Sequence, residues 1–133
     1  MFLLDTNILS DLIRNPQGVI AERIAEVGES EIATSIIVAS ELRYGAERRG
    51  SPRLTAQLEA VLELLPTLPL EDGADIHYGR LRKDLEQQGK PIGANDMLIA
   101  AHALSLGATL VTDNVREFER VAGLAMTNWL REV

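Results

Sequence analysis

The chain of 133 residues contains no cysteine. It can therefore form no disulfide framework, thiolate metal site or thiol nucleophile, and only oxygen and nitrogen atoms remain as ligands. A reducing compartment is consistent with this composition, and we expect the protein in the cytoplasm. A basic segment followed by a long apolar run is also missing at the N-terminus, because Asp5 interrupts it early, so we expect no secretory signal.

Long apolar runs and an excess of positive charge are absent as well. No stretch approaches the roughly 20 apolar residues that a membrane span needs, so we expect no membrane association. The formal net charge is −7, from 20 acidic and 13 basic residues. This balance argues against a protein that holds nucleic acid through bulk positive charge, and any nucleic-acid substrate must be met locally.

The composition that is present is typical of a folded domain. It is 46% hydrophobic and 25% charged, with no low-complexity tract or internal repeat. A chain of this length buries close to two-thirds of its unfolded surface around one core. We therefore expect a single domain over residues 1–133.

Short apolar runs alternate with helical patterns along the chain. This alternation favours an α/β fold with a parallel sheet and helices on both faces. Helical spacing predicts helices at 19–27, 36–48 and 94–106, the last apolar on almost every side, and two amphipathic stripes between residues 54 and 85. The predicted strands are Phe2 to Asp5, Glu31 to Ser35, Thr67 to Leu70, Thr109 to Thr112 and, more weakly, Ala125 to Thr127.

Four acidic residues occupy equivalent places in this pattern. The carboxyl ends of parallel strands and the amino ends of the crossover helices share one edge of the sheet, where ligands collect. Asp5 and Asp113 end predicted strands, and Asp96 lies in the first turn of the buried helix. Glu41 lies in the second turn of the helix after residues 31–35. The topology alone brings these acids together.

Each acid also has a simpler interpretation. Asp5 and Asp113 could be helix caps or turn formers, for which aspartate is well suited. Asp96 could complement the helix dipole, and Glu41 could belong to a solvated helix face. Their shared edge is what favours a functional interpretation.

A carboxylate cluster of this kind needs a cation. Two carboxylates about 4 Å apart repel by roughly 4 kcal/mol at an effective dielectric constant of 20. The neighbouring segments offer only Arg43 and Arg116, and the only lysines are Lys83 and Lys90. Oxygen ligands without histidine or cysteine suit Mg²⁺ or Mn²⁺, which keep open positions for substrate phosphate. The sequence thus indicates phosphoryl chemistry.

The motifs LLDTN, SELRYG, GANDMLIAAHA and LVTDNVREFERV, read together, resemble the PIN-domain ribonucleases and more closely the VapC toxins of bacterial toxin-antitoxin pairs. The resemblance covers nearly the whole chain. It implies a three-layer α/β/α fold with a central, mainly parallel sheet of four to five strands. It also implies a Mg²⁺-dependent or Mn²⁺-dependent endoribonuclease, a homodimer, and inhibition by a VapB-type antitoxin.

The same resemblance assigns residues. Asp5 and Asp96 match the principal metal ligands, and Glu41 matches the second acid. The fourth acid of many members falls at Asn114, whereas the neighbouring acid here is Asp113; we take Asp113, and either residue could face the site. The residues expected to orient the carboxylates and metal-bound water are Thr6, Asn7, Thr112 and Asn114.

The expected reaction is in-line attack of a metal-bound water on an RNA phosphodiester, in tRNA or another structured RNA. Arginines near the edge would bring the polyanion in. We expect loss of Arg43 or Arg116 to weaken cleavage without unfolding the protein. Two other classes stay open: an aspartyl-phosphate enzyme that is phosphorylated on Asp5, and a non-catalytic binding module whose acids are regulatory.

Overall fold

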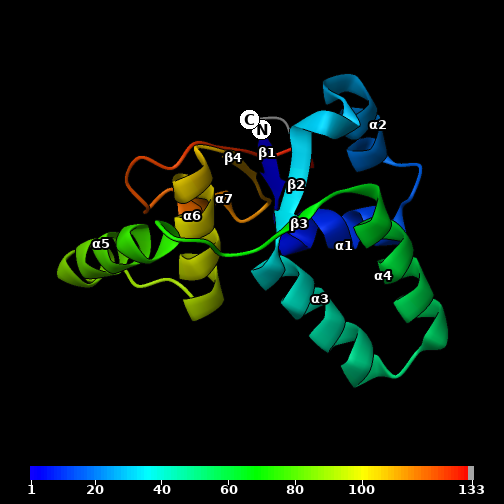
Figure 1. Ribbon diagram of the computed structural model, residues 1–133, viewed down its shortest axis with the longest axis horizontal. Helices are drawn as coiled ribbons and strands as arrows, with labels where there is room; N and C mark the ends of the chain where they lie inside the picture. The colour runs from blue at the N-terminus through cyan, green and yellow to red at the C-terminus, as the bar shows by residue number, and fades with distance from the viewer. Residues whose placement is uncertain (132–133) are drawn as a thin grey trace.

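The computed structural model describes residues 1–131, which form one five-stranded sheet in the order β3-β2-β1-β4-β5. All four strand pairs are parallel (Figure 1). The strands are β1 (Phe2–Leu4), β2 (Ile32–Ser35), β3 (Thr67–Leu68), β4 (Thr109–Val111) and β5 (Met126–Thr127). The helices are α1 (Thr6–Arg14), α2 (Val19–Val27), the 3-10 turn η1 (Glu29–Glu31), α3 (Ile36–Arg49), α4 (Pro52–Leu64), α5 (Ala74–Gln87), α6 (Ala94–Leu106) and α7 (Val115–Phe118).

The helices cover both faces of this sheet. In Figure 1, α5 and α6 lie on one side of the central strands, and α1, α2 and α4 lie on the other. The prediction of an α/β fold with a parallel sheet is therefore confirmed, and each strand ends within two residues of its predicted end. The apolar residues of all layers form one continuous core. Within residues 1–131, no helix is both long and apolar enough to cross a membrane.

The central strand β1 ends at the edge of the sheet where the predicted site residues lie. Leu3 and Leu4 are fully buried, as expected for a strand that is covered on both faces. Leu4 lies opposite Thr34 on β2 and Val111 on β4. Asp5 and Thr112, which follow Leu4 and Val111, therefore leave the sheet side by side, although they are 107 residues apart in sequence.

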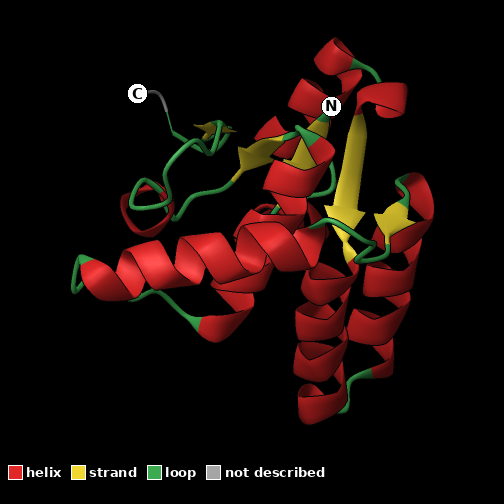
Figure 2. Cartoon of the chain, turned by 60° about the vertical axis from the view of Figure 1, so that its left-hand side comes forward, coloured by secondary structure: helices red, strands yellow, loops and turns green. Residues whose placement is uncertain are grey.

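Side-chain caps fix where the helices α3 and α4 begin. The Ser35 hydroxyl accepts a hydrogen bond of 3.1 Å from the Ile37 amide at the start of α3. At the other end of α3, Gly50 has a φ of 63°, a left-handed conformation that side chains disfavour. Ser51 then caps α4, with Pro52 in its first turn. The two helices consequently pack as the antiparallel pair that Figure 2 shows.

The buried helix α6 positions the next part of the edge. Ala100, Ala101 and Ala103 are buried, and their small side chains let α6 approach the sheet closely. His102 is 1% exposed, and its Nδ1 lies 2.8 Å from the Ser35 hydroxyl. This contact ties α6 to the start of α3. Asp96 lies in the first turn of the same helix.

Candidate active site

Asp5 is the most buried acid of the edge, with 3% of its surface exposed. One carboxylate oxygen accepts a hydrogen bond of 2.8 Å from the Thr6 amide, so Asp5 also caps α1. The other oxygen accepts one of 2.7 Å from the Thr112 hydroxyl and one of 3.3 Å from the Asn7 amide group. Burial raises the pKa of Asp5, and these hydrogen bonds offset part of that rise. The interpretation of Asp5 as a helix cap is confirmed, and its role as a site acid stays a prediction that this position at the edge allows.

Glu41 reaches the same place from the second turn of α3. Its Oε1 accepts a hydrogen bond of 2.6 Å from the Thr6 hydroxyl, and its Oε2 accepts one of 3.4 Å from the Asn95 side chain. The charge of Glu41 raises the pKa of both Asp5 and Asp96. Glu41 is thus a fixed member of the cluster and not part of a solvated helix face.

Asp96 is the acid on which the charges of the other site acids act most strongly. Its pKa is raised to about 7, first by burial and then by the charges of Glu117, Asp5 and Glu41. A hydrogen bond with Glu117 adds to the rise. The crowding of negative charge around Asp96 therefore favours its protonated form.

Glu117, on the short helix α7, is the fourth acid of the cluster. Its Oε1 accepts a hydrogen bond of 2.8 Å from the Gly93 amide, and its Oε2 accepts one of 2.6 Å from the Asn114 side chain. Burial alone would raise the pKa of Glu117, but these bonds, the bond with Asp96 and the charge of Arg120 lower it on balance. Asp96 is consequently the member of this pair that keeps the proton.

Glu117 is not among the site residues predicted from the sequence. A signal was present, because Asn114 and Glu117 stand three residues apart at the start of a helix, the spacing of a capping box. A glutamate at that place points back to the helix start, which lies at the same edge as Asp5. The four-residue length of α7 hid this helix from a search for longer periodic patterns.

The structure does not bring Asp113 into the cluster, which corrects the choice made from the sequence. Its Oδ1 accepts hydrogen bonds of 2.9 Å from Asn128 and 2.8 Å from Arg131, and the pairing with Arg131 lowers its pKa. The reason lies in the partners of the two neighbouring side chains. The Thr112 hydroxyl donates to Asp5, whereas Asn128 and Arg131, near the C-terminus, hold the Asp113 carboxylate.

The four predicted supporting residues do surround the acids. Thr6 bridges Asp5 and Glu41. Asn7 bonds to Asp5, and its Oδ1 accepts a bond of 2.9 Å from the amide of residue 113. The Thr112 hydroxyl also accepts a bond of 3.0 Å from the Asn114 amide. One network therefore links the ends of β1 and β4 with α7.

The two arginines predicted to contact RNA have different surroundings. Arg43 is hydrogen-bonded to Glu59 on α4, so its charge is already paired. Arg116 is exposed on α7, beside Glu117 in the sequence. The RNA-binding role of both residues stays a prediction.

Known proteins share this arrangement of elements. Residues 2–124 match the PIN domain family. The chain belongs to this family.

Curated and solved PIN-domain proteins resemble the chain over almost its whole length. It is 39% identical over 129 residues to the tRNA(fMet)-specific endonuclease VapC of Shigella flexneri, covering 96% of this chain and 97% of that protein. It is 42% identical over 130 residues to Ribonuclease VapC2 of Haemophilus influenzae, covering 97% and 98%. The solved VapBC2 of Rickettsia felis, bound to a DNA fragment from its promoter, superposes with a TM-score of 0.89 at 36% identity, covering 96% and 98%. The PIN-domain resemblance inferred from the four motifs is confirmed.

Proposed function

We propose that the chain is a metal-dependent endoribonuclease and the toxin of a VapBC-type toxin-antitoxin pair. The observation that supports this most strongly is the convergence of Asp5, Glu41, Asp96 and Glu117 at one edge of the sheet. The relatives that carry the names endonuclease and ribonuclease match this chain from end to end. We take structured RNA as the substrate class, with tRNA as the first candidate.

The donor atoms of the cluster fit Mg²⁺ or Mn²⁺. The acids offer only carboxylate oxygens, and the charges of Glu117, Asp5 and Glu41 that raise the pKa of Asp96 are ones that a cation would offset. No group of three or more His, Asp or Glu side chains within residues 1–131 is arranged to hold an ion by itself. Magnesium commonly uses one or two carboxylates and completes its shell with water. We assign Asp5 and Asp96 as the ligands, with Glu41 and Glu117 beside them.

A bound divalent ion supplies a water of lowered pKa and offsets negative charge on the leaving oxygen. The chain supplies orientation and charge. Three hydrogen bonds fix the Asp5 carboxylate in one position, and Thr6 and Asn95 fix Glu41. The raised pKa of Asp96 and the lowered pKa of Glu117 favour the proton of this pair on Asp96, and a cation held there would favour its ionised form.

A VapB-type antitoxin is the proposed partner. A hollow of about 230 Å³ lies between α1, α3 and α4, with Ile13, Leu42, Leu54 and Leu58 among its lining residues. Thr6 and Glu41 belong to the same lining. An apolar antitoxin segment seated there would end beside the acids. A homodimer, as the resemblance implies, stays a prediction.

The aspartyl-phosphate alternative is disfavoured by the surroundings of Asp5. A nucleophilic carboxylate needs an oxygen that can reach a phosphoryl group. Here the side chain is 3% exposed, and both oxygens accept hydrogen bonds. The three bonds suit a carboxylate that orients or binds a cation better than one that attacks.

Cleavage of tRNA by the purified chain, freed of antitoxin, tests the function. We expect cuts in the presence of Mg²⁺ and none in excess EDTA, with activity restored by Mg²⁺ or Mn²⁺. Asp5→Asn should reduce the rate by roughly 100-fold or more, because the ion loses a charged ligand, while asparagine still serves as the cap of α1. Cuts of equal rate in EDTA, or with Asp5→Asn, would contradict a metal-dependent site at this edge.

Glu117→Gln and Asp113→Asn form a matched pair that decides which acid completes the site. Glu117→Gln keeps an acceptor for the Gly93 amide but removes a charge next to Asp96, so we expect at least about a 10-fold loss of cleavage. Asp113→Asn removes the charge that pairs with Arg131 but keeps an acceptor for Asn128, so cleavage should stay within about twofold of the parent. Cleavage rates with tRNA and Mg²⁺ give the answer. A larger loss of cleavage for Asp113→Asn than for Glu117→Gln would make Asp113 the fourth acid of the site.

A further inference from the structure

A second feature lies beside the carboxylates, where the loop after α5 meets α7. It is an open hollow of about 670 Å³. The residues that line it are Gln88, Lys90, Arg116, Glu119 and Arg120. Three of these five are cations, in a chain whose net charge is −7. This hollow, lined by these five residues, is the basic hollow.

The α7 segment and the loop of residues 88–93 border both the basic hollow and the acids. Arg120 donates a hydrogen bond of 3.1 Å to the Pro91 carbonyl, and the Gly93 amide donates one of 2.8 Å to Glu117. These two bonds hold the loop of residues 88–93 against the α7 segment. Arg116 and Glu117 are adjacent in sequence, and Arg116 faces the hollow while Glu117 faces Asp96. A chain of phosphates that crosses α7 would therefore pass from one feature to the other.

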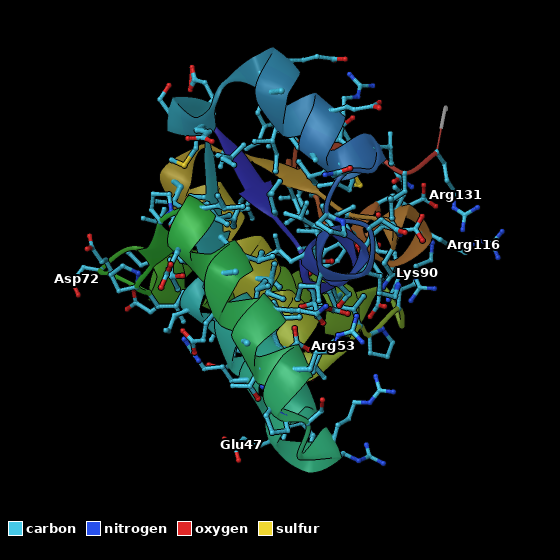
Figure 3. The ribbon with its side chains drawn as sticks, turned by 90° about the vertical axis from the view of Figure 1, so that its right-hand side faces the viewer. Glu47, Arg53, Asp72, Lys90, Arg116 and Arg131 are labelled. Carbon is cyan, nitrogen blue, oxygen red and sulfur yellow. The ribbon has the colours of Figure 1, made fainter. Side chains whose placement is uncertain are left out.

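The cations of the basic hollow are available to a ligand. Lys90 and Arg116 are exposed, and neither takes part in any of the five ion pairs found within residues 1–131. Arg43, by contrast, is already paired with Glu59. Figure 3 shows Lys90 and Arg116 along one edge of the molecule, whereas Asp72 projects from the opposite side.

We propose that the basic hollow binds a backbone phosphate of the RNA next to the phosphodiester that is cut. The inference rests on the proposed ribonuclease function and names the group that brings the substrate in. An RNA strand must approach four carboxylates, which repel its phosphates. The cations of the neighbouring basic hollow offset this repulsion. Guanidinium groups suit this task because they bind phosphate oxygens in a bidentate manner.

Phosphate binding at the basic hollow carries no sequence information. Contacts to the backbone fix register and affinity, whereas contacts to base edges select the sequence. The hollow should therefore raise affinity for any RNA that reaches the site and leave the position of the cut unchanged. This separates it from residues that select a particular RNA.

The test is a double variant, Lys90→Gln with Arg116→Gln, against a control of equal charge change, Arg23→Gln with Arg80→Gln. Arg23 lies on α2 and Arg80 on α5, and neither lines the basic hollow. All four residues are exposed, and thermal unfolding will confirm that both variants stay folded. Affinity for an intact tRNA transcript is measured in EDTA from about 50 to 300 mM salt. Cleavage with Mg²⁺ is measured separately.

We expect the double variant to bind about 10-fold or more weakly than the control at low salt. Each lost phosphate contact should lower the slope of log affinity against log salt by about 0.7 to 0.9. The rate at saturating RNA and the position of the cuts should match the parent. Equal affinity and equal slope in the two variants would overturn the proposal.

The two measurements keep this inference apart from the proposed function. A parent that cuts RNA, with a double variant that binds like the control, keeps the nuclease and removes the phosphate site. A parent that binds RNA through the basic hollow but never cuts it keeps the phosphate site and removes the nuclease. A parent that does not bind RNA removes both.

Discussion

Asp96→Asn is expected to reduce RNA cleavage by a factor on the order of 10² to 10³, because it removes the acid at the centre of the cluster. The side chain keeps its shape but loses the charge that would help to hold the proposed cation. The rate with tRNA and Mg²⁺ is the measurement, with Asp72→Asn as the control. Asp72 is an acid on the opposite side of the molecule from Lys90 and Arg116 (Figure 3).

The same variant should be more stable than the parent when metal is absent, and the difference should depend on pH. The pKa of Asp96 is about 7 in the folded state and close to 3.8 when unfolded, so the folded state binds the proton more tightly. The contribution of the protonated Asp96 to the free energy of unfolding is therefore full below about pH 4 and is lost as the pH rises through 7. Asparagine has no charge to lose.

At pH 8 we expect Asp96→Asn to raise the free energy of unfolding by about 1 to 2 kcal/mol in EDTA, a discounted value because Asp96 is only half buried. The melting temperature would rise by roughly 3 to 8 °C, and at pH 4 the two proteins should melt together. Adding Mg²⁺ should stabilise the parent more than the variant. A less stable Asp96→Asn protein at pH 8 would show that the acids do not repel one another.

Phe118→Ala is expected to lower the free energy of unfolding by about 3 to 5 kcal/mol. Phe118 is fully buried and is the apolar anchor of the four-residue helix α7. Its truncation leaves a cavity beneath the segment that carries Glu117. Urea unfolding followed by circular dichroism measures the loss.

Phe118→Leu is the matched variant, because it keeps an apolar side chain and should cost about 1.5 kcal/mol or less. Where Phe118→Ala still folds, it should also lose cleavage, since Glu117 is no longer held in place. A loss below about 1 kcal/mol for Phe118→Ala would mean that α7 is held by its hydrogen bonds alone.

Local signals account for most of what the sequence predicted correctly. Helix α6 begins and ends where the pattern placed it, at Ala94 and Leu106, because its apolar residues and Gly107 mark its length. The strand preceding Asp5 is apolar and short, as a strand covered on both faces should be. The edge on which the acids gather followed from the topology of parallel strands, which requires no side-chain detail.

The direction of individual side chains could not be predicted in the same way. Thr112 and Asp113 are adjacent in sequence, yet only Thr112 contacts Asp5. The partners that hold Asp113, Asn128 and Arg131, lie close to the C-terminus. Glu117 joins the cluster only because a single helical turn follows at once. Long-range contacts of this kind are invisible to periodicity.

The position of β1 in the middle of the sheet has a consequence for synthesis of the chain. Asp5 is made among the first residues of the protein, yet its bond to Thr112 joins groups that are 107 residues apart. The candidate site is therefore complete only after residues 112–117 have been made. We expect a chain that stalls before them to lack both the Thr112 bond and Glu117, and to bind and cut nothing at this edge.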